Sequence, residues 1–168
     1  PMEILQLWVN LPSRLKMTTP DYVGLQAADI PTFTTDGGVT VEPVSGEWLG
    51  VAAPIQSLID VHLAVVRLAA GARFDAPVAA GRNVFLYVVK GQVSVAGTHV
   101  PEWNLAALGD GEAVEITAAS DAVVLLGHAR PIGEPVFSHG PFVMNTREEI
   151  VQAIQDYQAG RFGPPPGL

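Results

Sequence analysis

The chain has no cysteine among its 168 residues, which excludes both a disulfide framework and thiolate chemistry. No apolar run reaches the roughly 18 residues that a membrane-spanning helix requires. The first residues also lack the basic and then apolar pattern of a signal peptide. These absences predict a cytoplasmic protein that makes no use of a membrane.

Basic residues are scarce. Lys16 and Lys90 are the only lysines, and Lys and Arg together number 9 against 17 Asp and Glu, for a net charge of −8 and a pI near 4.8. Proteins that bind nucleic acid draw their affinity from basic side chains that neutralise phosphates. We therefore expect no direct contact with nucleic acid, and for the same reason no attraction to an anionic membrane surface.

Charge of either sign is low. Charged residues make up 15% of the chain, against about a quarter in an average protein, while 48% of the residues are hydrophobic. A chain of this length forms one domain with a real core. Either that core is unusually large, or part of the surface is covered by another protein, which predicts domain docking or dimerisation.

Glycine (17) and proline (14) are abundant and spread along the chain, which is typical of many short strands joined by turns. Their spacing indicates an all-β fold, a small barrel or sandwich. The expected strands cover residues 39–44, 63–68, 84–89, 92–95, 113–116 and 122–127. Residues 84–89 are continuously apolar, as expected for a strand buried on both faces.

One helix is predicted near the C-terminus, over about residues 147–159. Thr146 and Glu149 form a capping box, in which each side chain pairs with a backbone amide at the start of the helix. Ile150, Ile154 and Tyr157 then form an apolar stripe, and Gly160 is placed to end the helix. Residues 164–168, which are rich in proline, form a stiff or disordered tail.

Four stretches, in order, resemble the second half of pirins, two-barrel proteins of the cupin superfamily. They are Gln-Leu-Trp-Val-Asn-Leu-Pro at 6–12; Lys16-Met17 followed by Pro20; residues 68–91; and Gly-Pro-Phe-Val-Met-Asn-Thr at 140–146, continuing to Asp-Tyr-Gln at 156–158 and Phe-Gly at 162–163. The resemblance implies a cupin-type β-barrel, or double-stranded β-helix, with a C-terminal α-helix. We expect a linker of interdomain type at 1–20, the barrel at 21–135, a C-terminal segment at 136–163 and the tail at 164–168.

Cupins bind a divalent metal with two His one residue apart, a Glu on the next strand and a His from a later strand, because imidazoles and one carboxylate leave open positions for a substrate. In this sequence the His pair falls within 77–80 (Pro-Val-Ala-Ala), the Glu at Val84 and the last His at Val114. Every position is apolar or proline. We therefore expect no metal, cofactor or catalytic residue in this chain.

The four histidines are His62, His99, His128 and His139, and no two lie within ligand spacing of each other. Asp60 and His62 alternate, so they point the same way, either as a carboxylate that orients an imidazole or as a structural pair near the barrel mouth. The structural interpretation is favoured, and the other three histidines are assigned to loops or strand ends.

Carboxylates offer a further possibility. Asp60 or Asp75 could pair with Glu112 or Glu115 as an acid and base. The sequence alone does not bring these residues together, and carboxylates in turns are far more often simply solvated.

The resemblance implies a structural and docking role for this chain, in support of a first barrel that lies outside it. Complete pirins carry an iron-type metal in that first barrel. Some oxidise flavonols, as quercetin 2,3-dioxygenases, and others act as regulatory protein partners. Alone, this chain is not expected to be an enzyme. Trp8 lies in the segment that joins the two barrels, where it would face the missing half.

Two alternatives remain open. The chain could bind or transform a small molecule in its own apolar barrel pocket, since Ala76, Ala79 and Ala80 are small. It could instead be a homodimeric interaction module, with a second copy in place of the missing barrel.

Overall fold

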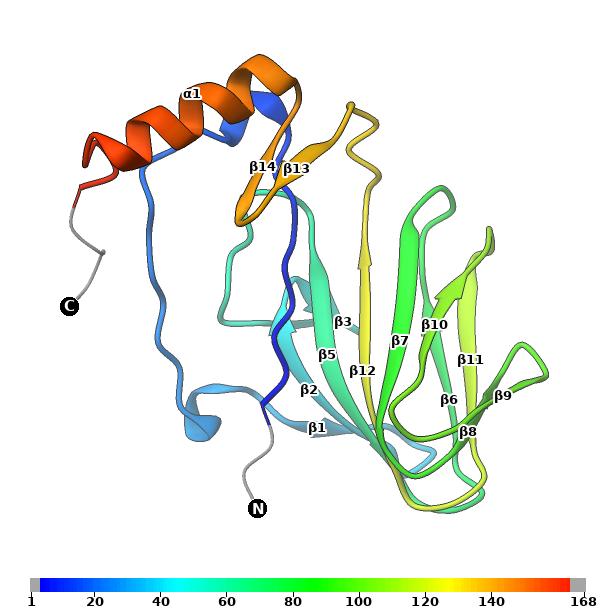
Figure 1. Cartoon of the computed structure of the whole chain (residues 1–168). Coiled ribbons are helices and arrows are strands. Elements are labelled where there is room, and N and C mark those ends of the chain that lie inside the picture. The colour runs from blue at the N-terminus through cyan, green and yellow to red at the C-terminus, as the bar shows by residue number, and fades with distance from the viewer. Residues whose placement is uncertain (1–3, 164–168) are drawn as a thin grey trace. The chain divides into compact units, whose positions relative to one another are not determined.

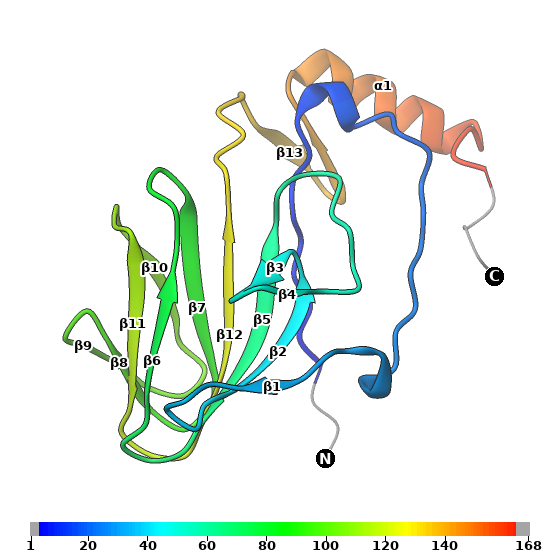
Figure 2. The ribbon, with the colours of Figure 1, turned by 180° about the vertical axis from the view of Figure 1, so that it is seen from behind.

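The structure is a computed structural model that describes residues 4–163 (Figures 1 and 2). The chain divides into a β unit, Gly24–Pro131, and a second unit made of residues 4–23 and 132–163. The expected tail at 164–168 lies outside the described residues. Within the part that is described, no helix is both long and apolar enough to cross a membrane.

The β unit contains two main antiparallel sheets. One has the strand order β1-β2-β5-β12-β7-β10, the other has the order β6-β11-β8-β9, and β3 and β4 form a separate hairpin. The bounds are β1 Phe33–Thr34, β2 Thr40–Ser45, β3 Glu47–Trp48, β4 Val51–Ala52, β5 His62–Leu68, β6 Arg73–Pro77, β7 Asn83–Lys90, β8 Val93–Val95, β9 Thr98–Val100, β10 Leu105–Leu108, β11 Ala113–Ala118 and β12 Ala122–Ala129. A short 3₁₀ helix, Ala27–Asp29, precedes β1.

The core lies between the two main sheets, since the buried side chains of both belong to one cluster. Alternate residues along each strand point into it, as the two-residue period of a strand requires. In β5 these are Ala64, Val66 and Leu68. Strand β7 buries Leu86 and Val88 completely and Val84 almost completely, whereas the residues on its other face, Phe85, Tyr87 and Val89, are half-buried.

All six expected strands are present, and the prediction of an all-β fold with a C-terminal helix is confirmed. Within residues 4–163 no strand pairs with the outer sides of β1 and β10 or of β6 and β9, so hydrogen bonding does not close the two main sheets into a continuous barrel. Strand β6 was not expected from the sequence. Its charged residues Arg73 and Asp75 alternate with buried Phe74 and Ala76, and Pro77 is accommodated because it ends an edge strand.

The second unit combines the hairpin of β13 (Phe137–His139) and β14 (Phe142–Met144) with α1 (Arg147–Gln158). Helix α1 packs on both strands. The capping box forms as predicted: Thr146 Oγ1 accepts from the Glu149 amide at 3.2 Å, and Glu149 accepts from the Thr146 amide at 2.9 Å. Gly160, with φ +69°, follows the helix end.

The N-terminal segment of this unit is held to its C-terminal part by two hydrogen bonds. Ser13 is the first residue of a short 3₁₀ helix, Ser13–Leu15, and its amide donates to Glu134 Oε2 at 2.7 Å. Lys16 Nζ donates to the Val143 carbonyl at 3.0 Å. The pKa of Glu134 is lowered, chiefly because its carboxylate accepts the bond from Ser13. Residues far apart in sequence thus form one compact unit.

Candidate functional site

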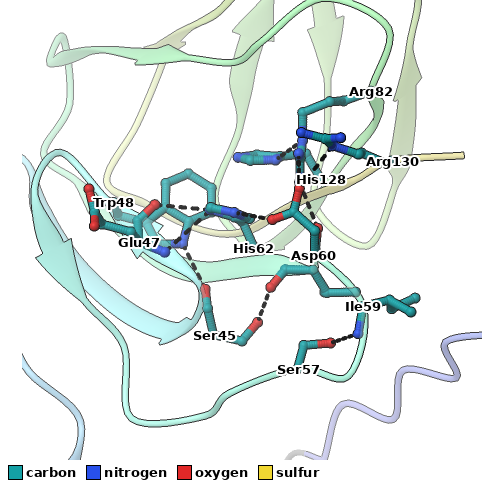
Figure 3. A network of polar contacts seen from close by, with 11 residues as sticks. Ser45, Glu47, Trp48, Ser57, Ile59, Asp60, His62, Arg82, His128 and Arg130 are labelled. Atoms are coloured by element: carbon teal, nitrogen blue, oxygen red, sulfur yellow. Dashed lines mark hydrogen bonds and ion pairs between the residues drawn. The ribbon is translucent and has the colours of Figure 1, made fainter.

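A cluster of polar side chains lies at one end of the apolar core of the β unit. Figure 3 shows the contacts within this cluster. His62 shares the inward face of β5 with Ala64, and His128 shares the inward face of β12 with Leu126. The two histidines are direct partners across the β5–β12 pair, and His128 is also opposite Val84 of β7. The strand register therefore places two imidazoles side by side where the apolar rows stop.

Arg82, immediately before β7, connects this cluster. Its side chain is 7% exposed. Nε donates to His128 Nδ1 at 2.8 Å, Nη1 to Asp60 Oδ2 at 2.5 Å and Nη2 to the Asp60 carbonyl at 2.6 Å (Figure 3). Arg130 Nε lies 3.3 Å from the same Asp60 oxygen. The hydrogen bond from Arg82 is the main reason that the pKa of Asp60 is lowered.

His128 is neutral at ordinary pH, and its tautomer is set by Arg82. The residue is 8% exposed, and burial, followed by the charges of Arg82 and His62, lowers its pKa to about 4. Because Nδ1 accepts from Arg82, the ring proton must sit on Nε2. That Nε2–H group has no hydrogen-bond partner within residues 4–163, and the residue lines a cavity.

His62, in contrast, has both ring nitrogens engaged. Nε2 lies 2.9 Å from Asp60 Oδ1, and Nδ1 lies 3.0 Å from the carbonyl oxygen and 3.3 Å from the amide nitrogen of Glu47. The Asp60–His62 pair expected from the sequence therefore forms. Its imidazole ties β5 to the β3–β4 hairpin and leaves no nitrogen for a substrate.

Three rings pack together in the cluster. His62 and His128 stack with centroids 4.5 Å apart at 20°, and Trp48 lies 5.2 Å from His128. Trp48 Nε1 donates to the Ser45 carbonyl at 3.2 Å. At Gly46, with φ +76°, a Cβ would lie 2.6 Å from the His62 ring, so this turn requires glycine.

The sequence did not predict that His128 joins His62 and Arg82 in one cluster. The 66 positions that separate the two histidines gave no ligand spacing, and only the register of β5 against β12 brings the rings together. One signal was present: each histidine occupies the apolar face of an alternating strand, which is where a partnered or functional histidine would be found.

A cavity of about 390 Å³ opens beside the cluster. Its polar side is formed by His62, Arg82 and His128, and its lining also includes Ala76, Pro77 and Ala79. A second cavity, of about 540 Å³, is lined mostly by apolar and small residues, among them Val78, Val84 and Val114.

The residues that the resemblance places at the cupin ligand positions are apolar or proline. Val84 and Val114 point into the core, and on β6 the inward residues are Ala76 and, just beyond the strand, Val78, rather than Pro77 and Ala79. Among residues 4–163, no three His, Cys, Asp or Glu side chains are grouped so that they could hold a metal ion.

The other candidate residues lie elsewhere. His99 is exposed on β9 and His139 is exposed on β13. Asp75 and Glu115 are partners across the β6–β11 pair, and Arg73 bridges them at 3.1 and 2.8 Å. All three side chains are more than half exposed, as in a surface ion-pair network, so the two carboxylates do not form an enclosed acid–base couple.

Comparisons with known proteins agree with this architecture. Residues 63–163 match the family described as the pirin C-terminal cupin domain. The chain is 48% identical over 163 residues to a pirin-like protein of Caulobacter vibrioides, covering 96% of this chain and 59% of that protein. It is 38% identical over 171 residues to pirin of Mus musculus, covering 97% and 58%.

Among solved structures, a quercetin 2,3-dioxygenase from Acinetobacter baumannii superposes with a TM-score of 0.87 at 31% identity, over 93% of this chain and 55% of that one. The chain therefore spans somewhat more than half the length of these relatives. On these matches, the chain belongs to the pirin family and corresponds to its C-terminal cupin domain.

Proposed function

We propose that this chain acts as a metal-free docking domain that binds a metal-bearing first cupin barrel of the pirin type. The observation that carries the proposal is the exposed apolar segment at residues 4–9. Trp8 is 66% exposed, and the side chains that accompany it are also exposed: Ile4, Leu5, Leu7 and Val9.

Such a run is unusual for a free surface. Scattered exposed apolar residues are normal, but a contiguous group marks a surface that another protein covers. Tryptophan is among the residues that most often dominate binding energy when buried in an interface. The low charged fraction of the chain, 15%, fits a surface that is partly covered.

The segment is also prepared for binding. The hydrogen bonds from Ser13 to Glu134 and from Lys16 to Val143 hold the chain immediately after it. An anchored segment loses less conformational freedom on association than a loose one does, so more of the contact energy remains as affinity.

The proposal assigns the chemistry to the partner. Val84 and Val114 leave the positions of the cupin ligands apolar in this chain. Relatives nearly twice its length include the Acinetobacter baumannii quercetin 2,3-dioxygenase. The first barrel would supply an iron-type metal and oxidise a flavonol, while this chain would complete and stabilise it.

The test uses the part of the Caulobacter vibrioides relative that this chain does not cover, purified as a separate protein. Mixing the two proteins should give a one-to-one complex by light scattering. Trp8→Ser should weaken binding by about tenfold or more, as expected for a central aromatic anchor. Trp103→Ser is the matched control, since Trp103 is similarly exposed, at 69%, in the β unit, and it should leave the affinity unchanged.

Other outcomes would contradict the proposal. A stable homodimer that excludes the added barrel would favour self-association instead. Stoichiometric iron in the isolated chain, or quercetin turnover by it alone, would show that the chemistry does not depend on a first barrel.

A further inference from the structure

We infer that the cavity of about 390 Å³ beside Arg82 and His128 is a binding site for an uncharged small molecule, which places an oxygen acceptor against His128 Nε2–H. This site is independent of the docking function. It also differs from a cupin metal site, because its polar side chains come from β5, β12 and the start of β7, whereas residues 77–80 contribute only apolar wall.

His128 presents a hydrogen-bond donor to the cavity that no described residue uses. His128 is more than nine-tenths buried and lines the cavity, and Arg82 holds its Nδ1 as an acceptor at 2.8 Å. Nε2 therefore carries a proton in a fixed direction, with no acceptor among the described residues. Among the described residues the only fully buried side-chain atom without a partner is Asn145 Oδ1, so Nε2–H is open to the cavity, where a ligand or water completes its pairing.

The charged residues around the cavity favour an uncharged ligand. The charged residues of the lining are Glu47, Asp60 and Arg82, so it carries no excess positive charge to attract an anion. Arg82 already directs Nε, Nη1 and Nη2 at His128 and Asp60. Asp60 is already paired with Arg82, His62 and Arg130. Glu47 could attract a cation, but an ammonium group has no lone pair to accept from Nε2–H. An uncharged carbonyl or hydroxyl oxygen meets neither obstacle.

The cavity has the apolar walls of a ligand pocket. Ala76, Pro77 and Ala79 supply a wall of small apolar side chains, next to the rings of Trp48 and His62. Ligand pockets generally measure about 300–1,000 Å³ and combine apolar walls with few polar groups. At about 390 Å³ this cavity lies near the lower end of that range.

The rim provides a further observation. Leu49 and Gly50 form the two-residue turn between β3 and β4, and both have positive φ, +50° and +84°. Such turns favour Asn-Gly, and a leucine in this left-handed conformation is strained. The strained side chain lines the cavity. Strain kept in this way is a known mark of functional positions.

The experiment compares three probes of nearly equal size: acetophenone as the uncharged acceptor, benzoate as the anion and benzylamine as the cation. Nitrogen-detected NMR of the histidine rings first establishes whether His128 is protonated at Nε2. A titration then follows that signal. We expect the Nε2–H form, and a saturable shift of this signal with acetophenone only.

Two variants locate the interaction. His128→Phe removes the donor but keeps a ring, and should weaken acetophenone binding about five- to tenfold, the usual effect of losing one hydrogen bond. His99→Phe, on exposed β9, is the matched control and should bind like the parent chain. Leu49→Asn should raise the melting temperature, because it relieves strain, and should weaken binding, because it removes apolar wall.

Three results would overturn the inference. These are an Nδ1–H tautomer at His128, no acetophenone-dependent shift of its ring signals, or binding of benzoate or benzylamine as tight as that of acetophenone. The ring measurements on the unaltered chain decide the matter even if His128→Phe does not fold.

Discussion

Arg82→Met should destabilise the β unit far more than an ordinary loss of one arginine. Methionine keeps much of the apolar stem but removes three hydrogen bonds, at 2.8, 2.5 and 2.6 Å. It leaves His128 Nδ1 without its donor and Asp60 without its main partner. Removing one member of a buried ion pair costs about 3–5 kcal/mol.

Asp60 moderates this cost. Its side chain is 44% exposed, so water can replace part of what Arg82 supplied. We therefore expect a loss of about 2–3 kcal/mol in the free energy of unfolding, or about 5–10 °C in melting temperature for a chain of this size. Urea denaturation, followed by tryptophan fluorescence because Trp48 packs against the cluster, measures it directly.

The effect should also depend on pH in a defined direction. The pKa of Asp60 is lowered in the folded state, mainly by Arg82, so the stability that the ionised carboxylate contributes is present above its unfolded value near 3.8 and is lost as pH falls through its folded value. The difference in free energy of unfolding between Arg82→Met and the parent chain should therefore become smaller at strongly acid pH.

Arg67→Met is the matched control. Arg67 donates to Glu42 at 2.9 Å, but its side chain is 52% exposed, and surface pairs of this kind contribute at most about 0.5–1 kcal/mol. If the two variants lose equal stability, or if the Arg82 variant shows no change in its acid dependence, then the network around Arg82 does not organise this end of the β unit.

Two further predictions concern stability. The pKa of His128 falls from its usual 6.5 to about 4 on folding, so the unfolded chain binds more protons between these values, and stability should fall as pH is lowered from about 6.5 to 4. The ring lines a cavity open to water, beside Asp60, His62 and Arg82, so we expect the free energy of unfolding to fall by about 1–2 kcal/mol rather than the full ~3 kcal/mol. Denaturation of the parent chain and of His128→Phe at several pH values in this range measures the effect, and the stability of the variant should depend less on pH. Gly91→Ala should cost about 3 kcal/mol or more, because φ is +80° and the new Cβ would lie 2.2 Å from the Asp121 carbonyl oxygen. Gly97→Ala, with φ +76° and open space, should cost only the ~1–2 kcal/mol of the backbone strain, and equal melting temperatures for the two variants would contradict this account.

Much of the fold was accessible from local patterns. The six expected strands are runs of alternating or continuous apolar residues between turns. The capping box at Thr146 and Glu149 marked the start of α1. Both signals come from residues that are close together in the sequence. The short strands β3, β4, β9 and β10 were not expected, since two to four residues give too little periodicity to recognise. Strand β6 was missed because Arg73 and Asp75 obscure the alternation that buries Phe74 and Ala76.

The polar cluster could be predicted only in part. Asp60 and His62 are two residues apart, so their common direction followed from strand geometry, and the contact was confirmed at 2.9 Å. Neither Arg82 nor His128 could be added to that pair from sequence. The contacts of Arg82 with Asp60 and with His128 span 22 and 46 residues, and no local rule decides them.

The sequence by itself determined that the cupin ligand positions hold Val84, Val114 and small apolar residues, because the identity of a side chain limits its chemistry wherever it lies. It also determined the capped C-terminal helix and the scarcity of basic residues. Only the tertiary structure decided that His62, Arg82 and His128 meet at one cavity, that no residue from 4 to 163 accepts from His128 Nε2–H, and that the apolar segment at residues 4–9 is exposed. Those features depend on strand register and on burial by distant residues, which are properties of the whole packed chain.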